Sequence, residues 1–151
     1  MQPDPAVPPA DQRLAASEAS TVRRVGEGYL AAIRSGDVDA MMAHWADNPT
    51  VLAPNAPGVR GRAEVRAWAE AFQKRVRVTE ARFTESEVTI GGDLATERLG
   101  FTMTLEPAAG GAPMILTGKG VHVYRRQADG NWKLSLDIWN ADNASTPGVS
   151  A

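Results

Sequence analysis

The sequence contains no cysteine and only two histidines, His44 and His122, among its 151 residues. The absence of cysteine excludes disulfide bonds, thiolate catalysis and cysteine-ligated metal sites. The two histidines do not have the spacing of a metal-binding motif. We therefore expect neither a zinc site nor any other metal, and no cofactor is indicated.

Neither sign of charge predominates, since the formal net charge is −2 and is spread along the chain. Such a chain has no basic surface for nucleic acid or for an anionic membrane. No apolar run approaches the length of a membrane span. The first residues, MQPDPAVPPADQR, lack the basic start and apolar core of a signal peptide. We expect a cytoplasmic protein that binds neither nucleic acid nor membrane.

The length and a hydrophobic content of 43% fit one domain with a substantial core. Residues 1–12 contain four prolines and few large apolar side chains, which predicts a disordered tail. Residues 143–151 are small and polar and predict a flexible tail. The folded domain is expected over residues 13–142.

Three helical stretches come first along the chain. Apolar side chains recur at helical spacing over Leu14–Ser35, and Gly36 is a plausible stop. Gly26 and Gly28 lower helix propensity there. Because they lie beside Tyr29, they could instead allow this helix to pack closely under a sheet.

The next two helices are shorter. Asp37 is expected to cap a helix in the segment DVDAMMAHWAD, which ends at Asn48-Pro49 because a residue before proline disfavours the helical region. A short strand over Thr50–Pro54 and a loop should then lead to a third helix, Arg62–Lys74. The apolar stripe of the second helix would consist of Val38, Met41, Met42 and Trp45.

The rest of the chain has the alternation of strands. Val76–Ile90 and Leu94–Glu106 flank a Gly-Gly-Asp turn, and Gly118–Asp142 has the pattern of a hairpin. Helices segregated from strands predict an α+β fold in which three helices pack on one face of a curved, mainly antiparallel sheet, forming a cone. Period-two alternation predicts an inner face made of Leu99, Phe101, Met103, Leu105, Trp132, Leu134, Leu136 and Ile138.

The same alternation places Asp137 on the outer face, with Lys133 and Ser135. There it would pair with Lys119 or Arg98 on adjacent strands. A β-bulge near Asp137 would reverse this assignment.

The chain resembles the nuclear-transport-factor-two-like superfamily, and within it the ketosteroid-isomerase-like or SnoaL-like proteins. The segments that carry the resemblance are YLAAIRSGDVDAMMAHWADNPTVLAP, RGRAEVRAWAEAF, GGDLATERLGFTMTL and GKGVHVYRRQADGNWKLSLDIWNAD. Together they cover most of residues 20 to 142. One fold of this kind hosts many functions, so the resemblance is more specific for fold than for activity.

The resemblance implies an oxygen-binding site. Tyr29 matches the tyrosine by which ketosteroid isomerases donate a hydrogen bond to the substrate oxyanion. His122 falls where those enzymes have a second donor, and with Tyr124 it would face inward. Either side chain could instead be a core group that is merely hydrogen-bonded. The general base of those isomerases is replaced by Ala53.

Two other polar residues are candidates for handling a proton or water. Asn55 shares the parity of Ala53 and could orient a ligand, although an asparagine there also favours a turn. Asp137 is loosely similar to a functional aspartate of the related epoxide hydrolases. With Tyr29 and His122 these residues form the predicted catalytic set. Further ligand contacts are expected from Trp45, Trp68, Phe101, Met103, Tyr124, Leu136 and Asn140.

The resemblance favours a cofactor-independent enzyme of isomerase, cyclase or hydrolase type, acting on an apolar ketone, epoxide or polyketide-like substrate. A module that binds a small hydrophobic metabolite without chemistry is the alternative, and a solidly filled structural domain is a third. A homodimer is also expected, through an exposed sheet face containing Val121, Val123 and Trp139.

Overall fold

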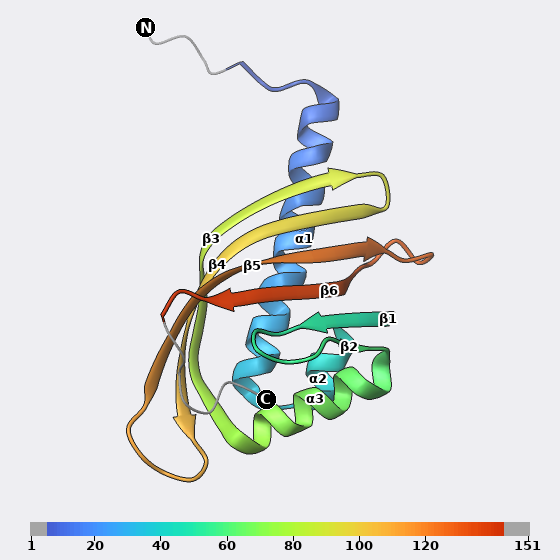
Figure 1. Ribbon diagram of the computed structural model, residues 1–151. Coiled ribbons are helices and arrows are strands. Elements are labelled where there is room, and N and C mark those ends of the chain that lie inside the picture. The colour runs from blue at the N-terminus through green and yellow to red at the C-terminus, as the bar shows by residue number, and fades with distance from the viewer. Residues whose placement is uncertain (1–5, 144–151) are drawn as a thin grey trace, which may run out of the picture.

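The computed structural model describes residues 6–143. Three helices and six strands form an α+β fold, as the sequence predicts (Figure 1). In chain order the elements are α1 (Ala10–Ser35), α2 (Val38–Ala43), β1 (Trp45–Leu52), β2 (Val59–Arg60), α3 (Arg62–Arg75), β3 (Val76–Gly91), β4 (Leu94–Pro107), β5 (Met114–Arg126) and β6 (Trp132–Ala141).

The six strands form one curved, unclosed sheet in the order β2-β1-β6-β5-β4-β3. All neighbouring strands are antiparallel except β1 and β6, which run parallel. The long strands β3, β4 and β5 bend, so the sheet makes a hollow that the helices cover (Figure 1). The core lies between the inner face of this sheet and the helices.

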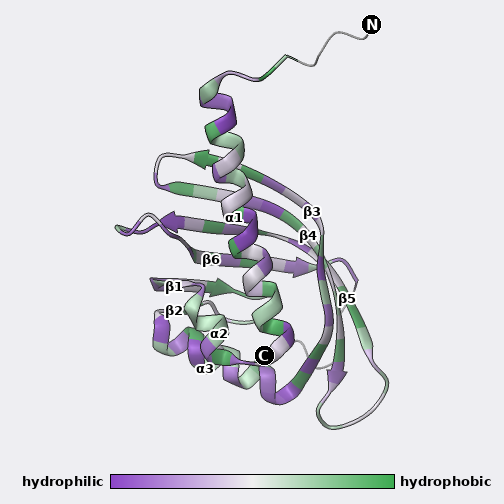
Figure 2. Ribbon diagram, turned by 180° about the vertical axis from the view of Figure 1, so that it is seen from behind, coloured by the Kyte–Doolittle hydropathy of each residue, from purple (hydrophilic) through white to green (hydrophobic). Residues whose placement is uncertain are grey.

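Helix α1 lies across one face of the sheet, and its first turns extend past the β3 edge (Figures 1 and 2). Its buried side is a stripe at helical spacing that includes Val22, Gly26, Tyr29 and Ile33. The helix ends as predicted at Gly36, whose φ of 71° is the left-handed conformation that glycine adopts readily.

The beginning of α1 differs from the prediction. The helix starts at Ala10, before Leu14, and so reaches into the stretch 1–12 that composition marks as disordered. Pro9 stands at the N-cap, where its lack of an N–H is harmless. Of the rest of the predicted tails, residues 6–9 and Asn143 form neither helix nor strand, and residues 1–5 and 144–151 lie outside the described residues.

Helix α2 is shorter than predicted. Asp37 caps it as expected, its side chain accepting a hydrogen bond from the Ala40 N–H at 3.1 Å. The prediction that Trp45 belongs to this helix is wrong, because Trp45 begins β1 and pairs with Leu134 of β6. Pro49 also lies within β1, where the pairing with β6 is irregular between Trp45 and Thr50. Proline lacks the N–H of a regular ladder, and an irregular segment accommodates it.

Strand β6 contains a bulge that changes the faces of the hairpin. Leu134 pairs with Tyr124 and Leu136 pairs with Val123, so Ser135 is an extra residue between the two pairs. The extra residue reverses the alternation beyond it. The inward assignments of Leu136 and Ile138 and the outward assignment of Asp137 are therefore wrong.

Accessibility supports the reversed faces. Asp137 is buried, while Ile138 is 42% exposed. The ion pairs predicted for Asp137 are made by other carboxylates, since Lys119 contacts Asp142 at 2.6 Å. Arg98 contacts Glu85 and Glu87.

Candidate functional site

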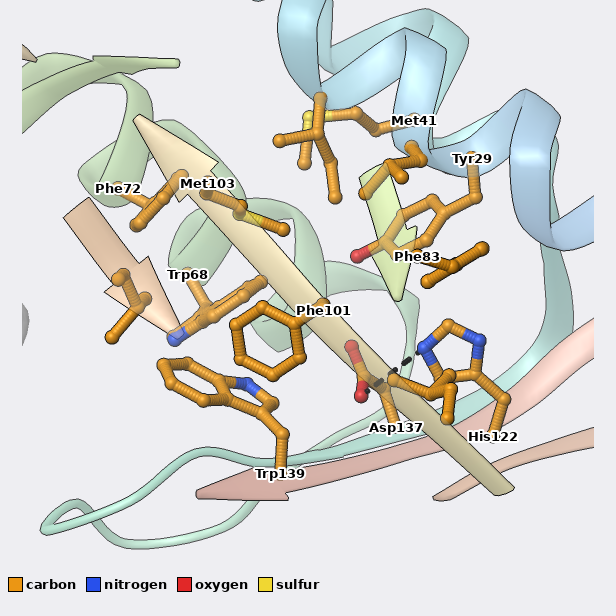
Figure 3. A pocket seen from close by; sticks show the side chains of 14 residues that line it. Tyr29, Met41, Trp68, Phe72, Phe83, Phe101, Met103, His122, Asp137 and Trp139 are labelled. Atoms are coloured by element: carbon orange, nitrogen blue, oxygen red, sulfur yellow. Dashed lines mark ion pairs between the residues drawn. The ribbon is translucent and has the colours of Figure 1, made fainter. Parts of the chain in front are cut away.

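A cavity lies between α1, α3 and the inner face of the sheet. Figure 3 shows its side chains converging from helices and strands that are far apart in sequence. Three polar side chains line it: Tyr29, His122 and Asp137. The rest of the lining is apolar and consists of Leu30, Ile33, Met41, Trp68, Phe72, Phe83, Leu99, Phe101, Met103, Leu116 and Trp139.

The cavity is narrow. The volume of the cavity is about 60 Å³. A single water needs roughly 10–15 Å³ on the same scale. The interior is therefore hollow, but it accepts only a slim ligand unless aromatic side chains move.

Aromatic rings form the walls. Trp68 and Phe72 lie one turn apart on α3 and stack with their ring centroids 5.9 Å apart. Phe101 and Trp139 meet edge to face at 5.7 Å. In Figure 3 Trp68, Phe101 and Trp139 lie on one side of Asp137, and Tyr29 and His122 lie on the other.

The two ionisable groups of the cavity face each other. The Nε2 atom of His122 lies 3.4 Å from Oδ1 of Asp137 (Figure 3). His122 is 4% exposed and Asp137 is 8% exposed. The imidazole and the carboxyl group therefore form a close polar pair that is shielded from solvent.

Tyr29 presents a protonated phenol to this cavity. Burial raises the pKa of Tyr29 well above its usual value, and the charge of Asp137 raises it further. Trp45 packs edge-on against the phenol ring with centroids 5.5 Å apart, and His122 does so at 6.1 Å. Tyr29 is therefore a neutral hydrogen-bond donor throughout the physiological pH range.

A second layer of polar groups lies behind His122. Its Nδ1 atom is 2.9 Å from the hydroxyl oxygen of Tyr124. That hydroxyl donates to Oε2 of Glu97 at 2.6 Å, and the hydroxyl of Ser86 donates to Oε1 at 2.6 Å. Glu97 is completely buried.

Helix α1 covers this second layer through a glycine. A Cβ atom on Gly26 would lie 2.6 Å from the Tyr124 hydroxyl and 2.9 Å from Oε2 of Glu97. These distances are shorter than real Cβ contacts, so only glycine allows the helix to approach so closely. The close packing under the sheet that was suggested for the glycines beside Tyr29 is present at Gly26, whereas Gly28 lies against His44.

The structure brings together most of the predicted site residues. Tyr29, His122, Trp68, Phe101 and Met103 all line the cavity. Asp137 joins them because of the bulge. Tyr124 faces inward as expected and is fully buried one layer behind His122, while Trp45 is buried against Tyr29. Neither Tyr124 nor Trp45 belongs to the lining.

Three predicted residues lie elsewhere. Asn55 is exposed in the loop after β1, with a φ of 58° that suits asparagine in a turn. Leu136 lies on the outer face because of the bulge, and Asn140 is exposed farther along the same face of β6. Ala53 packs against the core, so no carboxylate stands there.

Sequence reasoning missed Glu97 and misplaced Trp139. Glu97 lies on the same face of its strand as Leu99 and Phe101. An acidic residue on an otherwise apolar face is the feature of the sequence that could have indicated a buried role for Glu97. The prediction places Trp139 on the outer face, whereas the bulge directs its side chain toward the cavity. No residue type signals the bulge itself.

Within residues 6–143, no three side chains among His, Asp and Glu are grouped so as to bind a metal ion. In the same part of the chain, none of the helices has the length and apolar character required to cross a membrane.

Comparisons with known proteins agree with this architecture. No curated protein matches the chain. A ketosteroid isomerase-like protein from Erwinia carotovora atroseptica superposes with a TM-score of 0.75 at 19% identity, covering 84% of this chain and 98% of that one. A Salmonella enterica protein of the nuclear transport factor 2-like superfamily gives 0.78 at 14% identity, covering 88% and 96%.

A conserved protein from Planctomyces limnophilus gives a TM-score of 0.72 at 26% identity, covering 83% of this chain and 98% of that one. In sequence, residues 27–134 match the SnoaL-like domain family. The matched segment runs from the middle of α1 to β6 and contains Tyr29, Glu97, His122 and Tyr124. The chain therefore belongs to the SnoaL-like domain family, within the nuclear-transport-factor-two-like superfamily.

Proposed function

We propose that the protein is a cofactor-independent enzyme of isomerase, cyclase or hydrolase type that acts on an apolar ketone, epoxide or polyketide-like substrate. The observation that carries the proposal is that Tyr29, His122 and Asp137 are the polar side chains of an otherwise apolar cavity. An apolar pocket with a few convergent polar groups is the usual form of a small-molecule site.

Tyr29 would bind the substrate oxygen. Its phenol is neutral and is held by packing against Trp45 and His122. A preset donor in a site that excludes water stabilises an oxygen that gains negative charge during the reaction. The oxygen could be that of a ketone, an epoxide or an enolate.

The His122–Asp137 pair would handle the proton. The two groups are 3.4 Å apart and buried. When one of them gives up or takes a proton, the other can balance the change in charge. This pair supplies the acid or base that Ala53 cannot. Asn55 has no part in the proposed chemistry, since it is exposed outside the cavity.

The walls indicate the shape of the substrate. Rings of Trp68, Phe101 and Trp139 border a narrow space, which suits a flat, ring-containing molecule better than a bulky one. The reacting oxygen would point away from these rings, toward Tyr29 and His122.

A non-catalytic binding module remains the second candidate. It is favoured by the narrowness of the cavity and by the alanine at position 53. Such a module would use the same cavity and the same donor, but it would release its ligand unchanged.

Turnover measurements distinguish the two functions. We expect activity on at least one member of a panel of cyclic ketones, aryl epoxides and aromatic poly-β-ketones. Asp137→Asn should lower kcat by about 10²–10⁴-fold, the usual contribution of a general acid or base. Tyr29→Phe should lower it by about 10²–10³-fold, the usual effect of removing one oxyanion donor.

Asp142→Asn is the matched control, because it makes the same substitution in an exposed carboxylate that pairs with Lys119 outside the cavity. It should leave kcat unchanged. Ligand binding without turnover, together with an apolar molecule that co-purifies in native mass spectrometry, would favour the binding module. If Asp137→Asn and Tyr29→Phe fold normally and change neither turnover nor affinity, the cavity is not the site.

We also propose a homodimer formed through the outer face of the sheet. Val121 pairs with Ile138, Val123 pairs with Leu136, and Leu52 pairs with Ile138, so these apolar side chains are neighbours on that face. The helices of the described chain lie on the other side (Figure 2). A second copy related by a twofold axis could bury such a patch against its own equivalent.

A further inference from the structure

We infer that Glu97 and Tyr124 are positioning residues that keep a proton on Nδ1 of His122, so that the imidazole exchanges protons with the cavity only through Nε2. The inference deepens the proposed function, because it assigns the atom at which the proposed base would act. It concerns groups that lie outside the cavity lining and that a binding pocket alone would not need.

The direction of the hydrogen bonds can be followed inward from the surface. Arg23 can only donate, and its Nε lies 3.4 Å from the hydroxyl oxygen of Ser86. That oxygen therefore accepts from Arg23, and its own proton is directed to Oε1 of Glu97 at 2.6 Å. The carboxylate accepts at this oxygen.

The second oxygen of Glu97 completes the pattern. Oε2 accepts from the hydroxyl of Tyr124 at 2.6 Å, a short bond of the kind formed with an ionised acceptor. The phenol proton is then committed to Glu97. The phenol oxygen keeps its lone pairs for His122, whose Nδ1 lies 2.9 Å away. A proton on Nδ1 completes that hydrogen bond.

Burial makes this arrangement strong. Glu97 and Tyr124 are both fully buried, and α1 covers their hydrogen bond through Gly26. Burial raises the pKa of Tyr124 well above its usual value, and the charge of Glu97 raises it further, so the phenol does not ionise in place of the imidazole. An unpaired donor or acceptor here would be costly, because water cannot replace the missing partner.

The groups around His122 leave Nε2 as the exchanging atom. From α1 it faces Tyr29, from β3 the apolar ring of Phe83, from β4 Glu97, and from β6 Asp137. Tyr124 occupies the Nδ1 side from within β5. Only Nε2 is directed to Asp137 and to the cavity (Figure 3). When the imidazole gains a proton at Nε2, its positive charge lies between two carboxylates, 3.4 Å from Asp137 and 3.9 Å from Glu97.

The test is the protonation of each ring nitrogen, measured by long-range ¹H–¹⁵N correlation on ¹⁵N-labelled protein without substrate. The chain has two histidines, and a His44→Gln variant assigns the signals. We expect Nδ1 of His122 to remain protonated at every pH at which the protein is folded, while only the Nε2 shift changes with pH. A neutral ring protonated at Nε2 in the wild type would overturn the inference.

Two variants test the cause. Tyr124→Phe removes the partner of Nδ1, and Glu97→Gln removes the charge that orients the phenol. Each should move the ratio of the two neutral tautomers at least about tenfold toward Nε2–H, the effect expected for loss of a charge-assisted hydrogen bond. Glu97→Gln is nearly the same shape, so it still gives a result if Tyr124→Phe does not fold.

Tyr29→Phe is the matched control, since it removes a buried phenol that touches the same imidazole edge-on. It should leave the tautomer unchanged. An unaltered tautomer in both folded Tyr124→Phe and Glu97→Gln would overturn the inference. Failure of the proposed function is seen separately, because a fixed tautomer in a protein without turnover contradicts only the enzyme proposal.

Discussion

Replacing Gly26 by alanine should destabilise the protein, although the same change in an ordinary helix interior is stabilising. In an exposed helix the substitution contributes about 1 kcal/mol in favour of folding. Here the new Cβ atom would lie 2.6 Å from the Tyr124 hydroxyl and 2.9 Å from Oε2 of Glu97. Neither side chain can turn outward, because both are fully buried.

The magnitude follows from two destabilising effects and one stabilising effect. Overpacking a core costs about 1–3 kcal/mol. Separation of Tyr124 from Glu97 would cost about 1.5–3 kcal/mol, the value of a hydrogen bond to a charged group. After subtraction of the gain in helix propensity, the free energy of unfolding should fall by about 1.5–5 kcal/mol. For a chain of this length that lowers Tm by roughly 3–20 °C.

The assay is urea denaturation followed by circular dichroism, with Gly28→Ala as the matched control. A Cβ atom on Gly28 would meet Nε2 of His44 at 2.7 Å, but His44 is only half-buried and its ring can rotate away. That rotation loses the 2.9 Å hydrogen bond between Nδ1 and the Ala40 carbonyl, worth about 1 kcal/mol, which offsets the gain in propensity. Gly28→Ala should therefore be close to neutral.

A double-mutant cycle with Tyr124→Phe locates the clash. Removal of the phenol oxygen removes the closest contact, so Gly26→Ala should be less destabilising in that background. If Gly26→Ala is at least as stable as the wild type with an unchanged m-value, the close approach of α1 to the Glu97–Tyr124 pair is refuted. An equal destabilisation in both backgrounds would place the clash elsewhere.

Two further predictions concern pH and association. Tyr29 and Tyr124 are the only tyrosines of the chain, and burial raises the pKa of both, with a further increase from Asp137 and Glu97 respectively. The native state thus keeps protons that the unfolded chain loses above about pH 10, so stability is complete below that pH and falls as pH rises further. Tyrosinate absorbance should appear together with unfolding, whereas its appearance near pH 10 in protein with native circular dichroism would contradict the buried positions. Ile138→Lys places a charge in the proposed dimer face and should yield monomers in sedimentation velocity. The control is Leu14→Lys, which makes the same change at an exposed position of α1, away from that face. A wild type that is monomeric at micromolar concentration would exclude the dimer.

The fold class could be predicted because it depends on periodicity. Apolar residues at helical spacing in α1 and α3, and at period two in β4, determine which side of each element is buried. Local chemistry also marked the cap at Asp37 and the stop at Gly36. Such signals act within a few residues and can be recognised without knowing what packs against them.

The predictions that the structure contradicts concern residues whose backbone conformation depends on a partner remote in sequence. Trp45 fits the stripe of a helix, but its backbone pairs with Leu134, which is remote in sequence. In a sheet, backbone N–H and C=O groups form hydrogen bonds with the neighbouring strand, whereas the same groups at a helix end would have no partner. Tertiary pairing therefore overrides a local preference.

Periodicity alone predicted a helix-covered sheet with Tyr29 on the apolar stripe of α1, and the resemblance to the nuclear-transport-factor-two-like superfamily predicted that His122 faces inward. Only the tertiary structure decided that Asp137 joins them, because one extra residue at Ser135 turns the end of β6 over. The same holds for Glu97, whose role depends on Tyr124 lying across the ladder and on α1 sealing the pair. Alternation is a local property of one strand, whereas register and hydrogen-bond partners are set by strands that meet only in the folded protein.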